Sequence, residues 1–505
     1  MTIEGYMNNP ALNRHSLLRL ATIALAAMSL LNIGGCALMR KDSAPLAQVQ
    51  AEQIRAPRDV SLPVDAWPET QWWRRYGDDQ LDVLVARAID DSPTMAIARA
   101  RVEAGRAKAT LVDASTGVAV GLSASVDREH VSENGFLGPF ASTNSALGTS
   151  GPWYTEGTIG LQGEYSVDLW GKDRAKVNAA LGVLQARRAE AAEAELLLSS
   201  QVVHVYYDIQ ANYSVLTLLE QARDIQQQTV TAHHVRAARG LEPGTQAEGA
   251  LTQQLQFDQK ISATQTRIRS LREALRLLIG AGPDDLPVIT ARPLPDVIGD
   301  MPTSLGYELL ARRPDLQAMH WYVQASLDQV DVAKAAFYPS FDIRAFIGVD
   351  ALHMGDLFQQ SSKQINLIPG LSLPIFDSGR LNANLASARS QSNVLIAQYN
   401  QAVLNAVREV AQAAIELNGI NQQAAMQESE LKAATSSFNS ADAHYRQGLL
   451  DQSSATQAKL PVVMEEIRAV EIRSQRLHSE VTLMTYLGGG YEASAERQGL
   501  STNHG

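Results

Sequence analysis

A stretch without proline runs from Gly171 to Arg239 and ends where glycine and proline recur around Gly240. Its apolar residues return at alternating steps of three and four, which is the pattern of a coiled-coil seam. The seam consists of Leu198, Val202, Val205, Ile209, Leu216 and Leu219. At about 1.5 Å per residue, such a helix is roughly 100 Å long. A helix of this length exceeds a compact domain and must lie against other helices.

The helices that it needs are supplied by an internal repeat, which we place at 79–280 and 304–488. Matching residues are separated by 221 positions in the first part of each copy, as Pro93 and Pro314 are, and by 208 positions later, as Gly240 and Gly448 are. The separation changes inside a loop between two strands, so the flanking helices keep their lengths. A connector at 281–303 joins the copies, and a tail at 489–505 follows them.

Each copy contains two stretches in which apolar and polar residues alternate, and this alternation predicts β-strands. The predicted strands lie at about 118–127, 157–169, 341–350 and 364–376. Long helices are predicted at about 171–239 and 379–446, with tip turns at 239–245 and 447–453. The alternation by itself fits a transmembrane hairpin or a hairpin that covers a soluble core. Asp342 and Arg344 favour a water-filled lumen, because their burial in a dry core would be costly.

Residues 1–35 have the features of an export signal, in which Arg14 and Arg19 precede an apolar run. The run leads to Cys36, the only cysteine of the chain. A bacterial lipoprotein signal ends at such a cysteine, although a chance cysteine beside an ordinary signal is the alternative. We therefore predict N-palmitoyl and S-diacylglycerol attachment at Cys36 and a lipidated arm at 36–78. Alanine at position 37, instead of aspartate, favours outer membrane sorting in a Gram-negative host.

Composition and motifs argue against several other functions. The net charge is −11 without a basic block, which disfavours a nucleic-acid partner. His233 and His234 are adjacent and point about 100° apart on a helix, so a metal site is not expected there. The sequence has no hydrolase, zinc-protease or phosphate-loop signature, and we expect no catalytic residue, metal or cofactor.

The number of strands limits how this chain could cross a membrane. Beyond the signal, no window approaches the roughly 20 consecutive apolar residues of a membrane-spanning helix. Four strands cannot close a membrane barrel, whose smallest forms have about eight, and open edges are not tolerated in lipid. Strands from several chains are needed, and three chains would supply twelve.

Four motifs carry a resemblance to the TolC-like outer membrane factor family of tripartite efflux and secretion systems, in its NodT-type lipoprotein branch. They are Trp72-Trp73-x-x-Tyr76-x-Asp78-x-x-Leu81, Arg312-Arg313-Pro314-Asp315-Leu316, Ala335-Ala336-Phe337-Tyr338-Pro339 and Pro374-Ile375-Phe376-Asp377-x-Gly379-Arg380. The resemblance covers nearly all of the mature chain.

The resemblance implies a mostly helical chain with a β-barrel portion. Three copies would form a homotrimer with a 12-stranded transmembrane barrel, continued by a 12-helix periplasmic coiled-coil tunnel. The implied function is a passive exit duct in the outer membrane for small molecules, such as drugs or toxic compounds. An inner-membrane transporter would deliver them through a periplasmic adaptor.

The resemblance also assigns adaptor contact to the tip turns Arg239-Gly240-Leu241 and Gln447-Gly448-Leu449. Glycine permits a positive φ and close approach of another backbone, although these glycines could also serve only to end helices. Tyr445 and Asp451 are the candidate gate residues. Some relatives carry aspartate rings just past the second turn, but here the matching positions are Ser454 and Gln457.

Two other functions remain open. A periplasmic adaptor is also a lipoprotein with a helical hairpin, but it has one hairpin between β-rich halves instead of a duplicated unit. A structural coiled-coil lipoprotein without a pore would leave the alternating strands unexplained.

Overall fold

The computed structural model describes residues 70–130, 153–296 and 312–491, together with positions 39, 42–49, 132 and 134. Two compact units divide the chain: the first contains 105–184 and 322–396, and the second contains 48–104, 185–321 and 397–505. The long helices contribute residues to both units. Cys36, Trp67, the whole predicted signal, positions 297–303 of the predicted connector and positions 492–505 of the predicted tail lie outside the described residues.

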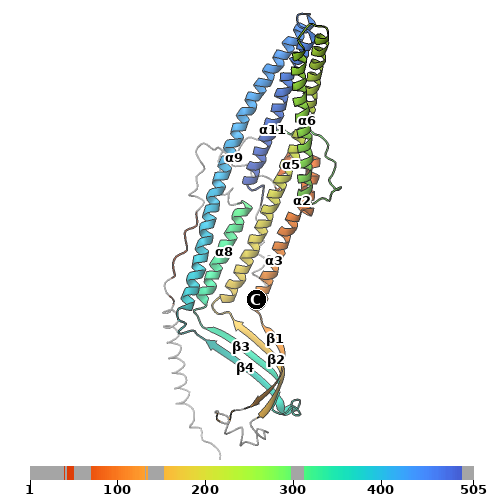
Figure 1. The fold of residues 1–505 in the computed structure, drawn as a ribbon. Coiled ribbons are helices and arrows are strands. Elements are labelled where there is room, and N and C mark those ends of the chain that lie inside the picture. The colour runs from red at the N-terminus through yellow and green to blue at the C-terminus, as the bar shows by residue number, and fades with distance from the viewer. Residues whose placement is uncertain are drawn as a thin grey trace, which may run out of the picture. The chain divides into compact units, whose positions relative to one another are not determined.

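The chain is mostly helical with one small sheet (Figure 1), and in each half of the described chain a helix is followed by two strands, a long helix and a shorter helical segment. The first series is η2 (Trp72–Tyr76), α2 (Asp79–Asp91), α3 (Pro93–Ser115), β1 (Ala119–His130), β2 (Trp153–Val167), α5 (Lys172–Ala238) and α6 (Gly244–Leu278). The second is α8 (Pro314–Ala335), β3 (Ser340–Ala351), η4 (Gln360–Ser362), β4 (Lys363–Ser372), α9 (Arg380–Arg446), α10 (Gln452–Gln457) and α11 (Leu460–Tyr486).

The two long helices, α5 and α9, have 67 residues each and begin in the same way. The Asp168 carboxylate accepts hydrogen bonds from the first backbone N–H groups of α5, and Asp377 does the same for α9. Such caps satisfy donors that a helix cannot pair internally. Among the described residues, no helix combines the length and the apolar character needed to cross a membrane.

The last helical segment, which covers 452–486, is interrupted once. It is divided into α10 and α11 around Ala458 and Lys459. Pro461 explains the division, because proline is accommodated in the first turn of a helix but cannot donate a backbone hydrogen bond further in. Asp451 caps α10 by accepting from the backbone N–H of Ser454.

The core of the second unit lies around α5. Tyr206, Tyr207 and Ile209 are fully buried, and they pack with residues of α2, α6 and α11. Trp72, Trp73 and Tyr76 belong to the same core, and the ring of Trp72 contacts those of Trp73 and Tyr76 edge to face. The aromatic motif at the start of the chain therefore packs within the helical unit.

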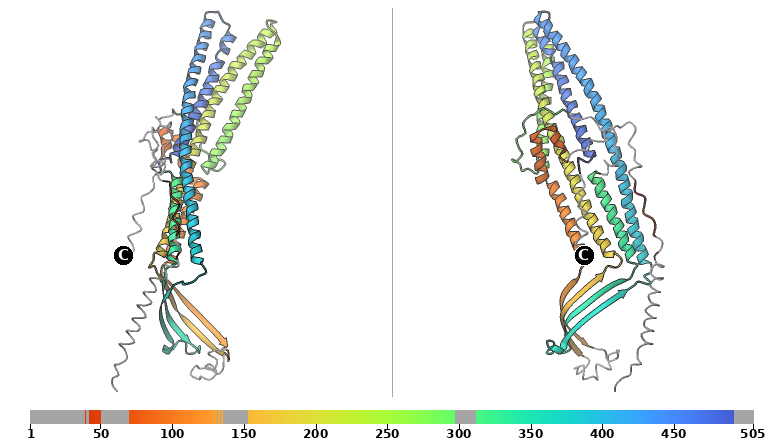
Figure 2. Two further views of the ribbon diagram at one scale, coloured as in Figure 1. Left: turned by 90° about the vertical axis from the view of Figure 1, so that its left-hand side faces the viewer. Right: turned by 180° about the vertical axis from the view of Figure 1, so that it is seen from behind.

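The first unit holds a single antiparallel sheet in the order β1-β2-β3-β4. Figure 2 shows the four curved strands side by side from two further directions. β1 extends three residues beyond the predicted strand, because its pairing with β2 continues through Arg128, Glu129 and His130 without a bulge. β1 and β4 form the two edges of this sheet.

Candidate functional site

The sheet has one apolar and one polar face, and the register aligns each across all four strands. Leu122, Leu161, Ile347 and Ile365 form one apolar row, and each is more than half exposed in the single chain. The neighbouring row on the opposite face contains Ser123, Gly160, Gly348 and Gln364. An exposed apolar row of this length requires a cover, because a sheet in water normally exposes its polar face.

The polar face carries charges in a cross-strand pair. Arg344 Nε lies 3.6 Å from Glu164 Oε1, and both side chains are mostly exposed. Gln162 donates to the Ser123 hydroxyl at 2.8 Å. These contacts place the charged Arg344 on the face opposite the apolar row.

Phe346 is an aromatic residue on this polar face that simple alternation did not reveal. Its ring covers Gly160 and Gly348, so closely that a Cβ on Gly160 would lie 2.4 Å from ring carbon Cζ. The two glycines leave the space that the ring fills, so the Phe346 ring packs where their side chains are missing. No signal at position 346 alone could have shown this pairing, because it depends on the register of β2 and β3.

The two tip turns of the second unit have the same backbone structure. Gly240 and Gly448 have φ values of 70° and 75°. After α5, Gly240 N–H bonds to the carbonyl of Ala237 and Leu241 N–H to that of Arg236; the corresponding bonds follow α9. Both turns are therefore Schellman motifs, in which a left-handed glycine ends the helix.

The turns present two exposed leucines. Leu241 is 72% exposed and Leu449 is 71% exposed. The flanking Arg239 and Gln447 are also exposed. Two apolar side chains on separate tips give a surface that another protein can contact, because exposed leucines gain by leaving water.

An ionic network links the two tips within the second unit. Arg236 on α5 donates to Asp451 at 3.0 Å, and Glu242 accepts from His233 at 2.7 Å. Arg236 also lies 3.9 Å from Glu242. Hydrogen bonds from Ser454, helped by the charge of Arg236, hold the pKa of Asp451 below its ordinary value.

The tip network clarifies three residues considered from the sequence. Asp451 caps α10 and pairs with Arg236, which sequence analysis could not foresee because the partners are 215 positions apart. Ser454 donates its hydroxyl to the Asp451 carboxylate at 2.6 Å. Tyr445 lies in the last turn of α9 and is 39% exposed, and its backbone carbonyl accepts from Gly448.

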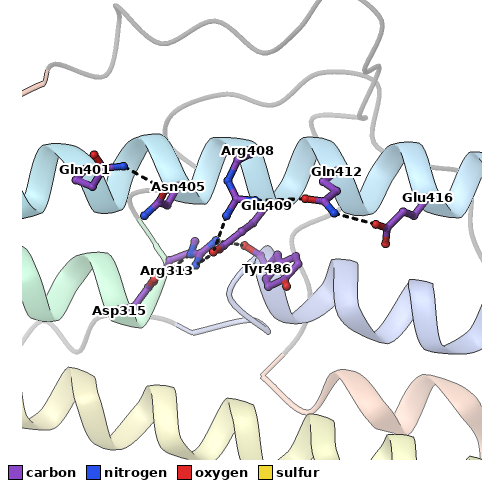
Figure 3. Close-up of polar contacts among 9 residues, drawn as sticks. All are labelled: Arg313, Asp315, Gln401, Asn405, Arg408, Glu409, Gln412, Glu416 and Tyr486. Carbon is purple, nitrogen blue, oxygen red and sulfur yellow. Dashed lines mark hydrogen bonds and ion pairs between the residues drawn. The ribbon is translucent and has the colours of Figure 1, made fainter.

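A second polar network lies where α8, α9 and α11 meet in the second unit. Arg313 is largely buried and binds both carboxylate oxygens of Asp315, at 3.0 and 2.8 Å (Figure 3). It also donates to Glu409 at 3.0 Å and to the carbonyl of Tyr486 at 3.2 Å. The guanidinium therefore ties three helical segments together through bidentate and single charged hydrogen bonds.

Two buried titratable groups stand out in the helical core. The ring of His204 lies 4.5 Å from that of His478, and burial lowers the pKa of His204 to about 4. Burial raises the pKa of Glu480 to about 7, although Arg75 lies 3.6 Å away. The described residues contain no cluster of three or more His, Cys, Asp or Glu side chains suited to a metal ion.

The arm that would follow a lipidated Cys36 is seen from Asp42 onward. Arg389 on α9 donates to Asp42, with Nε at 3.1 Å, and Lys334 lies 3.7 Å from the same carboxylate. The backbone N–H of Leu46 donates to Asn393 at 3.0 Å. These contacts fix the arm against α9 in the first unit, six positions after Cys36.

The fold and these surfaces define a class of protein: long antiparallel helical hairpins combined with an antiparallel sheet that is apolar on one exposed face. The profile of the family described as outer membrane efflux protein matches residues 84–281 and 305–489, more than half of the chain. The chain therefore belongs to the outer membrane efflux protein family.

Named relatives and solved structures agree with this assignment. The multidrug resistance outer membrane protein MdtP of Shigella flexneri is 48% identical over 92% of this chain and 95% of its own length. The multidrug resistance outer membrane protein MdtQ of Escherichia coli O157:H7 is 37% identical over 92% of this chain and 97% of its own. The outer membrane protein VceC of Vibrio cholerae matches with a TM-score of 0.74 and 28% identity, over 84% of this chain and all of VceC. The chain is thus an outer membrane efflux protein, as its motifs indicated.

Proposed function

We propose that three copies of this chain form the outer membrane exit duct of a tripartite efflux system. The observation that carries the proposal is the apolar row Leu122, Leu161, Ile347 and Ile365, which ends at the open edges β1 and β4. In lipid, unpaired backbone groups at such edges are costly, so the strands must be joined to strands of other copies. Three copies supply twelve strands, whose polar faces would line the pore, and their helices would form a 12-helix periplasmic tunnel.

The proposed substrates are small toxic compounds, including drugs. The support is the description of relatives at 48% and 37% identity as multidrug resistance proteins. An inner-membrane transporter would supply these compounds through a periplasmic adaptor. The role of the channel in this scheme is passive and requires no catalytic group or cofactor.

We further propose that Cys36 carries the lipid anchor and that the tips bind the adaptor. The Asp42 and Leu46 contacts with α9 support an ordered arm shortly after the lipidated residue. Glutamate at Leu241 and Leu449 should abolish adaptor binding in a pull-down with the purified adaptor. Leu277→Glu, which replaces an equally exposed leucine on α6, serves as the control. Equal binding by all three variants would remove the tips from the interface.

The central test is single-channel conductance of the detergent-extracted protein in a planar bilayer, with Tyr445→Phe beside the wild type. Openings that are more frequent in the variant would support both the pore and a gate at Tyr445. Unchanged openings would retain the pore and exclude Tyr445 from the gate. No conductance, even after deletion of the tips, would favour a structural lipoprotein that forms no pore.

A further inference from the structure

The charged residues at the distal end of the sheet are sorted between its two faces. This end, remote from the helices that flank β1 and β2, contains His130 paired with Trp153 and Arg128 paired with Thr155. The pairing continues without a bulge from the centre of the strands, so side chains keep alternating between faces. Arg128, His130 and Trp153 consequently lie on the face that carries Leu122 and Leu161.

The acidic residues of the same segment lie on the opposite face. Asp127 pairs with Glu156, and Glu129 pairs with Tyr154, all in the register of the polar rows. Adjacent residues of a strand point to opposite sides, so neither Asp127 nor Glu129 can neutralise Arg128 across the sheet. Within the described part of the chain, no carboxylate lies within ion-pair distance of Arg128.

Arg128, His130 and Trp153 form one contiguous surface, which we call the distal basic cluster. The guanidinium carbon of Arg128 lies 5.5 Å from the centre of the Trp153 ring. The His130 ring lies 4.8 Å from the same ring in an edge-to-face arrangement. Trp153 is 53% exposed, so the cluster offers a flat aromatic surface beside a cation.

The same face continues as an apolar surface next to the cluster. Val126 pairs with Gly157, and Met354 and Leu357 of the β3–β4 connection pack over Gly157. On β4, Lys363 pairs with Val349 and adds a second cation to this face. A band of Trp, Arg and Lys at the end of an apolar surface matches the polar boundary of a membrane.

We propose that the distal basic cluster binds the phosphorylated head group of an outer-leaflet lipid. The inference rests on the proposed function, which places the apolar face in the membrane and its distal end at the outer surface. Arginine presents a planar fork of donors that matches phosphate oxygens, and Trp153 holds that fork in position through its ring. Thr155, beside Arg128 on this face, offers a hydroxyl to the same group.

The test measures binding of bisphosphorylated lipid A to the purified oligomer in detergent micelles, with dephosphorylated lipid A as the comparison lipid. Arg128→Gln should weaken binding of the phosphorylated lipid on the order of fivefold, which corresponds to the loss of one basic residue near a charged membrane surface. Trp153→Leu, which keeps the charge, should weaken it less. Arg344→Gln is the matched control, because it removes an arginine from the polar face of the same sheet.

Equal binding by wild type and Arg128→Gln would overturn the inference, as would an equal loss in Arg344→Gln. Competition by millimolar inorganic phosphate alone would also overturn it, because the site would then be a free phosphate site. Heat-resistant oligomers on a gel show whether each variant folds. If Arg128→Gln does not fold, the binding measurement on Trp153→Leu provides the test. If the wild type conducts but binds phosphorylated and dephosphorylated lipid A equally well, this inference alone is contradicted. If the wild type does not conduct, the proposed function is contradicted.

Discussion

Arg236 on α5 donates a hydrogen bond to Asp451, the cap of α10, across 215 positions of sequence. The pair joins the first helical tip to the second. Asp451 is held in place by Ser454, whose backbone and hydroxyl both donate to its carboxylate. The Asp451 end of the link is therefore fixed. A gate at the tips would have to break the Arg236–Asp451 hydrogen bond or move both residues together.

Arg236→Gln should increase the frequency of channel opening, because it removes the ionic link between the tips. Both partners are more than a third exposed, so the effect is at most about 1 kcal/mol, or about fivefold. Single-channel recording at low and high salt is the measurement, since screening should weaken the wild-type link and leave the variant unchanged. Arg223→Gln, which removes an arginine that pairs with its neighbour Asp224 and makes no contact to Asp451, is the control.

The acid dependence of this link follows from the lowered pKa of Asp451. A carboxylate with a lowered pKa contributes stability above its ordinary pKa and loses it as pH falls through the lowered value. The link should therefore persist at mildly acidic pH and fail only under strongly acidic conditions. An opening frequency that already increases near neutral pH would have to result from the titration of a group other than Asp451.

The sequence predicted the helices and strands well, because their signals are local. The proline-free stretch and its spacing indicated α5, and the alternation indicated all four strands within a few residues. The contacts that link distant segments were not predictable. The Arg236–Asp451 pair and the Phe346 ring over Gly348 depend on the folded arrangement, and periodicity contains no information about either.

Glu480 should destabilise the protein at neutral and alkaline pH. Burial raises its pKa to about 7, from an ordinary value of 4.5, so the folded state disfavours the charged form. The resulting cost is absent below the ordinary pKa, grows as pH rises through this interval, and is complete above pH 7. Glu480→Gln should stabilise the protein on the order of 2 kcal/mol at pH 8 and have little effect at pH 4.5.

Thermal unfolding followed by tryptophan fluorescence at the two pH values measures this difference. Glu471→Gln, an exposed residue on the same helix, should show no such pH dependence. A Glu480→Gln variant that is less stable at pH 8 would show that the ion pair with Arg75 outweighs the cost of burial.

His204 should make the helical unit sensitive to acid. Its pKa is lowered to about 4 by burial and by the neighbouring His478, against an ordinary value of 6.5. Between these two pKa values His204 is protonated in the unfolded chain but not in the folded chain, so stability falls as pH drops from 6.5 towards 4. His204→Gln should remove a loss on the order of 2 kcal/mol over this interval.

Melting temperatures of both proteins between pH 7 and pH 4.5 provide the measurement. His444→Gln, on an exposed part of α9, is the control and should leave the acid sensitivity in place. Parallel curves for His204→Gln and wild type would assign the acid sensitivity to another group.

Arg313→Met should be strongly destabilising, because it leaves the carboxylates of Asp315 and Glu409 without their shared cation. Removal of one partner from a buried ion pair typically costs about 3–5 kcal/mol. Arg313→Lys should cost less, since lysine keeps the charge but cannot bind Asp315 with two parallel hydrogen bonds. Chemical or thermal unfolding of the two variants ranks them, and Arg313→Met with Glu409→Gln should recover part of the loss.

Gly348→Ala should prevent correct assembly of the sheet. A Cβ at this position would lie 2.4 Å from the backbone carbonyl oxygen of Ile159 and 2.6 Å from Cα of Gly160, and backbone atoms cannot move aside as a flexible side chain can. The methyl group would force β2 and β3 apart and displace the Phe346 ring. Overpacking of this kind typically costs about 1–3 kcal/mol and sometimes more.

Gly121→Ala is the matched control, because Gly121 lies on the polar face of β1 and a Cβ there meets no atom within 4 Å. The yield of heat-resistant oligomer in the outer membrane fraction is the measurement. We expect a clear loss for Gly348→Ala and wild-type yield for Gly121→Ala. Equal yields would mean that the β2–β3 register differs in the assembled protein, and the apolar row from Leu122 to Ile365 would then have to be redrawn.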